Sequence, residues 1–153
     1  PGDFKSGFVQ LADGTKVPRS YGSMTYALLK SFVFAGLSQD DPRVEACWKW
    51  LCENYTLDVN PGFAPGGDPV APYQGLYYYF HTMAKALDVY GVDEVVDGEK
   101  VAHDWRAELA GRLLSLQDRG NGSWTNRNAP RWWEGNPVLA TSYALLSLGA
   151  ARK

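Results

Sequence analysis

The feature that most constrains the fold is an alternation between helices that are apolar on all sides and helices that are apolar on one side. Helical periodicity predicts helices over residues 22–36, 42–54, 74–90, 103–117 and 137–150. The first, third and fifth are apolar almost all round, whereas the second and fourth confine their apolar residues to one face. A helix that is apolar on all sides must be buried on all sides. We therefore predict an all-α fold in two layers, with outer helices covering inner helices that face a shared apolar centre.

The segments between the helices carry turn signals. Asp13-Gly14 and Asp97-Gly98 each lie between short runs of β-forming residues and predict two small hairpins. Residues 56–73 hold four prolines and three glycines, which predicts a long connecting loop. Asp41 followed by Pro42 has the form of a helix N-cap and a first helical residue.

Composition excludes two classes of partner. The 153 residues suffice for one domain with a sizeable core, and a net charge of −2 with scattered basic residues leaves no electrostatic footprint for nucleic acid. No apolar run approaches the ~18 residues that indicate a membrane span. The chain starts without a signal-peptide pattern, and its first residue, Pro1, predicts a processed or truncated piece of a longer protein.

Two cysteines bear on the compartment. Cys47 and Cys52 are five residues apart on one predicted helix, too far along its axis for an unstrained disulfide. Free thiols favour a reducing compartment, so a soluble, cytoplasmic protein is the expectation, although these residues do not fix the compartment.

A glycine–aromatic phrase recurs before each inner helix. Its copies are Gly7-Phe8, Gly62-Phe63 and Gly122-Ser123-Trp124. Each copy is followed by a loop and an inner helix, and the first two units continue into an outer helix. Units of this kind cannot bury their apolar faces singly, so they stack. We predict that residues 1–153 form a single repeat domain with units starting near Gly7, Gly62 and Gly122.

Three residues of the last unit carry a family resemblance. Gln117, Gly122 and Trp124 resemble the glutamine–tryptophan motif of the triterpene cyclases, Gln-x-x-x-Gly-x-Trp, with one extra residue between the glutamine and the glycine. The phrases over residues 20–27 and 133–137 also look like the prenyltransferase and squalene-oxidase repeat family. The resemblance covers nearly the whole chain.

The resemblance implies a fold and a ligand class. The family has an α/α toroid of alternating inner and outer helices around an apolar cavity for isoprenoid chains. Its motif implies that Gln117 and Trp124 are structural residues that tie helix ends together. Five helices are too few to close such a ring, so the chain is expected to be a C-terminal fragment or a half-toroid. Its exposed apolar helices would then pack against a second copy of the chain or a missing N-terminal half.

The catalytic signatures of the family are incomplete. The Asp-x-Asp-Asp acid of class II cyclases is absent, and Asp40-Asp41 is interpreted as a helix cap. Phe80-His81-Thr82 resembles the setting of a zinc-binding histidine in the zinc-dependent protein prenyltransferases, but their Asp-x-Cys pair is missing. His81 is therefore either a core histidine bonded to a neighbour or a lone zinc ligand. No cofactor is expected unless His81 belongs to a zinc site.

Aromatic residues on and beside the inner helices are the candidates for a ligand pocket. Aromatic walls stabilise cations through the ring quadrupole, although each ring can equally be part of the core. Glu134 is expected either to cap the fifth helix or to act as an acid at a cavity mouth. The predicted pocket residues are Tyr26, Tyr78, His81, Trp132, Trp133 and Tyr143, and the catalytic candidates are His81 and Glu134.

Three functions are consistent with these patterns. The first is a cyclase-like or prenyltransferase-like domain that binds an isoprenoid or another apolar ligand. The second is a non-catalytic repeat module for structure or protein interaction. The third is a relative of the zinc-dependent prenyltransferases.

Overall fold

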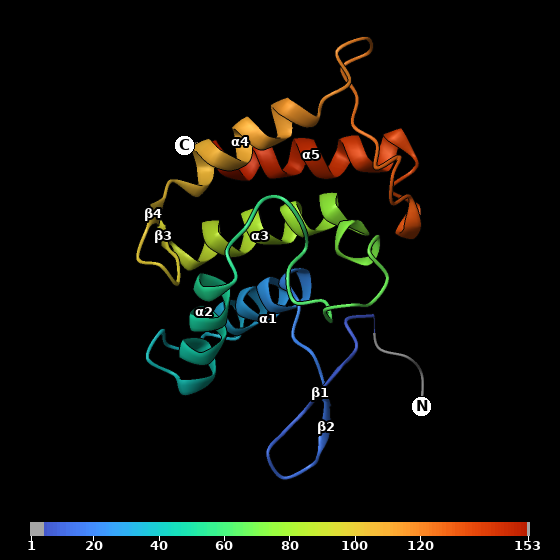
Figure 1. Ribbon diagram of the computed structural model, residues 1–153. Helices are drawn as coiled ribbons and strands as arrows, with labels where there is room; N and C mark the ends of the chain where they lie inside the picture. The colour runs from blue at the N-terminus through green and yellow to red at the C-terminus, as the bar shows by residue number, and fades with distance from the viewer. Residues whose placement is uncertain (1–4, 153) are drawn as a thin grey trace.

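Five helices make up most of the protein. The computed structural model describes residues 5–152 (Figure 1). The helices are α1 (Gly22–Phe34), α2 (Pro42–Glu53), α3 (Leu76–Tyr90), α4 (Trp105–Leu116) and α5 (Pro137–Ala151). Their bounds lie within two residues of the predicted ones, which confirms the all-α class. Pro1, on which the expectation of a truncated chain rests, lies outside the described residues.

Both predicted hairpins form. In the first, β1 (Phe8–Gln10) pairs antiparallel with β2 (Lys16–Pro18), and in the second β3 (Val95–Val96) pairs with β4 (Ala102–His103). Short 3₁₀ helices precede two of the long helices: η1 (Ala71–Tyr73) precedes α3, and η2 (Arg131–Trp133) precedes α5. The β1–β2 hairpin projects from the body (Figure 1).

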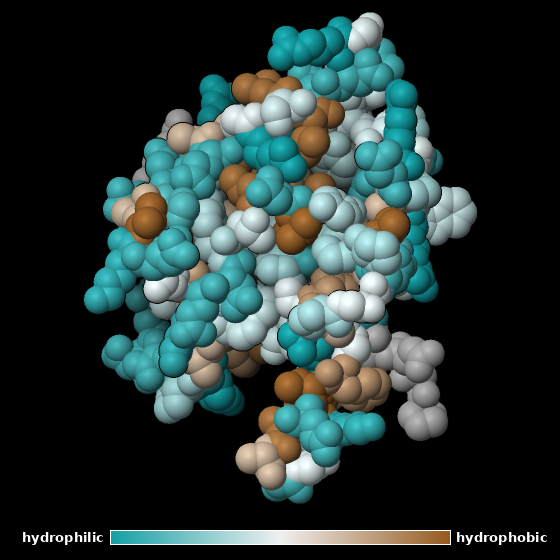
Figure 2. Space-filling view, viewed as in Figure 1, coloured by the Kyte–Doolittle hydropathy of each residue, from teal (hydrophilic) through white to brown (hydrophobic). Residues whose placement is uncertain are grey.

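Helix α3 lies between α1 and α5, and the three run in the same direction (Figure 1). Helix α2 packs on α1 and reaches α3, where the rings of Trp48 and Tyr90 are 4.8 Å apart. Helix α4 packs on α5, and a hydrogen bond from Tyr55, just beyond α2, to Glu108 of α4 joins the two outer segments. The face seen in Figure 2 is mostly hydrophilic, with hydrophobic residues in small separate groups.

The inner helices are not equally buried. Helix α3 is enclosed along most of its length, and its Tyr79, Phe80 and Met83 have no exposed surface. Helices α1 and α5 each leave an apolar edge open, where Leu28 is 47% exposed and Leu145 56% exposed. The prediction that the inner helices are buried on all sides is therefore correct for α3. It is wrong for α1 and α5, because α3 covers only one flank of each.

Each loop supplies a cap for the inner helix of the unit before it. The Asn60 side chain accepts a hydrogen bond from the Ser23 amide at the start of α1, at 3.0 Å. Glu134 accepts from the Tyr78 amide at the start of α3, at 2.8 Å. The prediction that Glu134 caps the fifth helix is wrong, since Asn136 caps α5 through the amide of Val138. The loop before α5 folds back over α3, which brings Glu134 to the earlier helix.

The three repeat glycines share a backbone conformation. Gly7, Gly62 and Gly122 have φ angles of 78°, 101° and 74°, in the left-handed region that favours glycine. At Gly62 an added Cβ would also clash with the Ser20 carbonyl oxygen. The predicted repeat positions therefore coincide with positions where the backbone itself requires glycine.

Trp124 joins two helices, as the resemblance implies. Its indole Nε1 donates to the Leu113 carbonyl in α4 at 2.8 Å, and its backbone amide donates to the Thr141 hydroxyl in α5 at 3.1 Å. The Gln117 side chain has a more local contact than expected, because its Nε2 donates to the carbonyl of Gly122 and closes the turn after α4.

Cys47 and Cys52 are free thiols, as predicted. Burial raises the pKa of each thiol to about 11. Within residues 5–152, none of the helices is both long enough and apolar enough to span a bilayer.

Candidate ligand-binding site

An aromatic hollow lies beside the N-terminal ends of α1 and α3, next to α5. It encloses about 290 Å³. Its wall comes from all three predicted repeat units, because Tyr21 belongs to the first, Tyr78 to the second and Trp132 and Tyr143 to the third. The complete lining is Lys5, Tyr21, Ser23, Gly75, Tyr78, Trp132 and Tyr143.

The structure brings together half of the predicted pocket residues. Tyr78, Trp132 and Tyr143 line the hollow, and the Tyr78 and Tyr143 rings meet edge to face at 5.7 Å. His81 lies behind this wall, stacked on Tyr143 at 5.7 Å. Tyr26 and Trp133 are outside it: Tyr26 is fully buried in the core against Tyr79, and Trp133 is 77% exposed.

Three rings surround the ammonium group of Lys5. Lys5 Nζ lies 5.5 Å from the ring centre of Tyr21, 5.4 Å from that of Phe63 and 5.6 Å from that of Trp132. These distances are within the ~6 Å range of cation–π attraction. We call these three rings the aromatic cage. Lys5 Nζ also donates a hydrogen bond to the Gln74 carbonyl at 3.1 Å.

The ammonium group of Lys5 is partly removed from water. Burial lowers the pKa of Lys5 below its ordinary value, while the Glu134 carboxylate opposes this shift and Arg131 adds to it. Arg131 also lies over the Trp132 ring, with its Cζ 4.9 Å from the ring centre. Two cationic side chains therefore meet at Trp132.

The backbone at Trp132 is strained. Trp132 and Trp133 have φ angles of 61° and 66°, in the left-handed region that side-chain-bearing residues rarely adopt. Gly75 lies opposite, and a Cβ there would be 3.7 Å from Trp132 Cδ1. Strained backbone clusters at binding sites, where the surrounding structure holds it in place.

Glu134 is a buried cap rather than an acid at a cavity mouth. Its side chain is fully buried and does not line the hollow. Its oxygens accept from the Tyr78 amide at 2.8 Å and from Asn126 Nδ2 at 2.9 Å. Burial raises the pKa of Glu134, and the hydrogen bonds from Asn126 and from the first turn of α3 oppose that shift. A carboxylate bonded in this way serves the N-terminus of α3.

The surroundings of His81 do not fit a zinc site. Among residues 5–152 there is no group of three or more His, Cys, Asp or Glu side chains that could hold a metal ion. Burial, followed by the charges of Lys30 and Lys85, lowers the pKa of His81. Its buried Nδ1 has no hydrogen-bond partner, so the expectation of a histidine bonded to a neighbour is not met at that atom.

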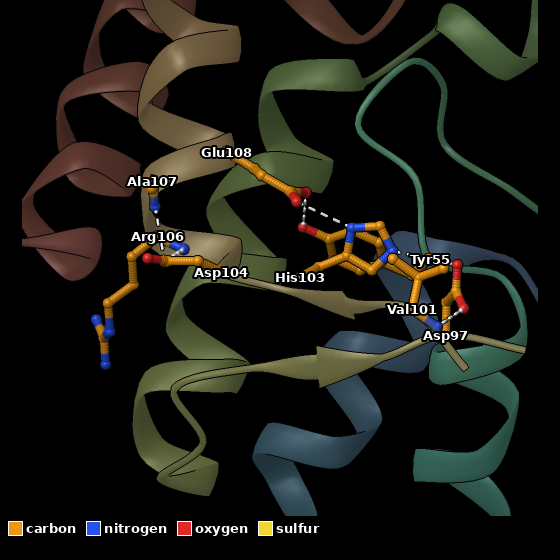
Figure 3. Close-up of polar contacts among 8 residues, drawn as sticks. All are labelled: Tyr55, Asp97, Val101, His103, Asp104, Arg106, Ala107 and Glu108. Atoms are coloured by element: carbon orange, nitrogen blue, oxygen red, sulfur yellow. Dashed lines mark hydrogen bonds and ion pairs between the residues drawn. The ribbon is translucent and has the colours of Figure 1, made fainter. Parts of the chain in front are cut away.

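A second polar cluster surrounds His103, near the start of α4 (Figure 3). Its Nδ1 lies 2.9 Å from Glu108 Oε1 and its Nε2 lies 3.1 Å from Asp97 Oδ2. Tyr55 donates to the same Glu108 carboxylate at 2.9 Å and its ring lies 4.6 Å from the imidazole. Burial lowers the pKa of His103, but the hydrogen bonds and charges of the two carboxylates outweigh it and raise the pKa overall. Through the contacts of His103, the cluster holds the β3–β4 hairpin against α4.

A larger depression of about 460 Å³ runs between α3, α4 and the loop after α4. Its charged side chains already pair with one another: Arg112 with Asp58 at 3.4 Å, and Arg127 with Asp118 at 3.2 Å. We therefore take the aromatic hollow as the candidate site.

Comparison with family models, curated proteins and solved structures finds no significant match to this chain. Functional inference consequently rests on the geometry of the site and on the motifs of the sequence.

The sequence patterns missed four residues that line the hollow, Lys5, Tyr21, Ser23 and Gly75, as well as Phe63 of the aromatic cage. Tyr21 directly precedes α1, as Trp132 and Trp133 shortly precede α5, so its place in the repeat could have indicated it. Phe63 belongs to the second glycine–aromatic phrase and was a visible candidate. Lys5 carries no local signal, since it reaches the hollow through contacts with residues far along the chain.

Proposed function

We propose that this domain binds the apolar chain of an isoprenoid, or of a similarly elongated molecule, in the aromatic hollow. One observation carries the proposal: aromatic side chains from three separate repeat units surround a single open hollow. Ligand sites are typically concave and apolar with a few polar groups, which is the character of this lining. The hollow is near the lower end of the usual ~300–1,000 Å³ range, so it would hold part of a long ligand.

We further propose that the domain is part of an α/α toroid of the prenyltransferase and squalene-oxidase repeat type. The motif Gln117, Gly122 and Trp124 supports this, together with the contacts of Trp124 to α4 and α5. The parallel layer of α1, α3 and α5 with α2 and α4 packed on it also supports it (Figure 1). In such a ring the hollow would face the centre.

The proposal is for binding rather than for catalysis by this chain alone. Of the two catalytic candidates, Glu134 is occupied as the cap of α3 and His81 lies behind Tyr143. An acid that protonates an isoprenoid would have to come from residues beyond those that line the hollow.

Two neighbouring tryptophans give the experiment a matched pair. Farnesol is titrated into the wild-type chain, Trp132→Ala and Trp133→Ala, with affinity measured by calorimetry. Removing the Trp132 ring should weaken binding about tenfold or more, because the ligand would bury this half-exposed ring and burial of an aromatic side chain contributes roughly 1.5–3 kcal/mol. Removing the exposed Trp133 ring should leave affinity within about twofold. Equal effects of the two substitutions, or no binding by the wild type, would reject the proposal.

The open apolar edges favour a second candidate, an interaction module without a small ligand. Leu28 on α1 and Leu145 on α5 are about half exposed, and large apolar side chains left exposed in a patch mark contact sites. A chain that self-associates while failing to bind farnesol would favour this function over the first.

A further inference from the structure

We propose that the aromatic cage of Tyr21, Phe63 and Trp132 is a binding site for the alkylammonium group of an external ligand, and that Lys5 occupies it from within the chain. The inference rests on the proposed function in one respect, because it places the ligand's apolar chain in the same hollow. It adds a charged head group to the ligand class and gives Lys5 the role of an internal competitor.

The geometry of the cage is that of a cation site. Three rings lie at nearly equal distances, 5.4 to 5.6 Å, from one ammonium nitrogen. They come from the start of α1, from the long loop after α2 and from η2, so the fold assembles them from distant parts of the sequence. Rings that present their faces to a shared point attract a cation through their quadrupoles.

The charges around the cage favour a cation, but one other than a primary ammonium. The Glu134 carboxylate attracts positive charge at this position, and Arg131 opposes it. Lys5 loses hydration there and regains one hydrogen bond, to the Gln74 carbonyl. A quaternary ammonium is weakly hydrated and needs no hydrogen bond, so it loses less on entering the same rings.

The cage opens into the hollow. Tyr21 and Trp132 belong to both, whereas Phe63 belongs to the cage alone and Tyr143 to the hollow alone. A ligand with an alkylammonium head and an apolar chain can therefore place its head between the three rings and its chain against Tyr78 and Tyr143. The left-handed backbone at Trp132 fixes one of the two rings that the cage and the hollow share.

The first experiment replaces the internal occupant. Lys5→Met keeps the stem without the charge, and Lys5→Arg keeps a charge. Choline is titrated into both variants and the wild type, alongside 3,3-dimethylbutan-1-ol, its neutral isostere. Lys5→Met should bind choline about tenfold more tightly than the wild type does, and about tenfold more tightly than it binds the isostere. Lys5→Arg should stay at the wild-type level. Thermal unfolding of each variant verifies that the fold is kept.

The second experiment separates this inference from the proposed function. In the Lys5→Met background, Phe63→Ala should abolish choline binding and leave farnesol binding within about twofold, and Tyr143→Ala should do the reverse. Equal affinity of Lys5→Met for choline and for the isostere would overturn the cage assignment. So would choline binding that survives Phe63→Ala. Loss of farnesol binding alone would count against the proposed function and not against the cage.

Discussion

Glu134 illustrates how much a single residue depends on distant parts of this chain. It lies between a tryptophan and a glycine just before α5, where local rules favour a cap for α5. In the structure it is buried against the start of α3 and bonds to Asn126 and to the amide of Tyr78. A carboxylate removed from water is tolerated only when its oxygens are hydrogen-bonded, and here they are.

Removing this carboxylate should destabilise the fold strongly. Glu134→Ala removes the acceptor of the Tyr78 amide and leaves Asn126 Nδ2 with the Tyr73 carbonyl alone, which costs about 2–3 kcal/mol of unfolding free energy. Glu45→Ala, on the exposed face of α2, is the control and should change stability by less than about 0.5 kcal/mol. Urea denaturation at pH 7 measures both. A Glu134→Ala variant as stable as the control would refute the capping role.

The two histidines should respond to pH in opposite directions. The folded-state pKa of His103 is raised, so its stabilising contribution is present below the unfolded pKa of ~6.5 and is lost as pH rises through the folded value. The folded-state pKa of His81 is lowered, so the protein loses stability when pH falls through ~6.5 and the unfolded chain takes up the proton.

Substitution by glutamine exposes this difference. His103→Gln should be less stable than the wild type at pH 5.5, by up to about 1 kcal/mol, with a gap that narrows towards pH 8.5. The unfolding free energy of His81→Gln should rise relative to that of the wild type as pH falls over the same range. Urea denaturation at four or five pH values tests the pair, and parallel pH profiles for the two variants would contradict the assigned shifts.

At the scale of elements, the joints between the predicted repeat units depend on backbone that only glycine adopts without strain. Gly62 has a φ of 101°, and a methyl group there would meet the carbonyl oxygen of Ser20. Gly36, at the end of α1, has a φ of 75° with open space around it. The two positions separate the cost of a left-handed backbone from the cost of a steric clash.

Alanine substitutions should therefore differ in their effects. Gly36→Ala should cost about 1–2 kcal/mol of unfolding free energy, the usual cost of a left-handed backbone. Gly62→Ala should cost about 3 kcal/mol or more, because it adds a backbone clash at the joint with α1. Thermal or urea unfolding gives the comparison. A Gly62→Ala variant no less stable than Gly36→Ala would contradict the predicted clash, because the backbone would then have shifted to accommodate the methyl group.

Local sequence rules account for the elements and not for the site. Apolar periodicity located all five helices, and Asp-Gly dipeptides located both hairpins, because these signals act within a few residues. The same rules could not separate Tyr26, which is buried, from Tyr78 and Tyr143, which line the hollow. They also could not bring Lys5 to Trp132, since that contact depends on how three loops fold together.

On the scale of the whole molecule, α1 and α5 are left with open apolar edges. Met24 and Leu28 are about half exposed on α1, and Val138 is 74% exposed and Leu145 56% exposed on α5. Helices of this composition are normally covered, as α3 is here. The two edges belong to α1 and α5, which flank α3 on its two sides.

We therefore predict that the isolated chain self-associates through these edges. Sedimentation velocity should show dimers or larger species at micromolar concentration. Leu28→Lys combined with Leu145→Lys should shift the chain to monomer while its helical circular dichroism is retained, because each lysine places a charge in the contact. A wild-type chain that stays monomeric and stable at ~100 μM would contradict self-association.

We propose that the three predicted repeat units together form one ligand site at the hollow. Titration of the ¹⁵N-labelled chain with farnesol, followed by NMR, tests it most directly. We predict shifts that saturate and are largest for the Trp132 indole and the amides of Gly75 and Tyr78, with none at Asp97 and His103. Shifts confined to the edges of α1 and α5, or an unchanged spectrum, would contradict a ligand site at the hollow.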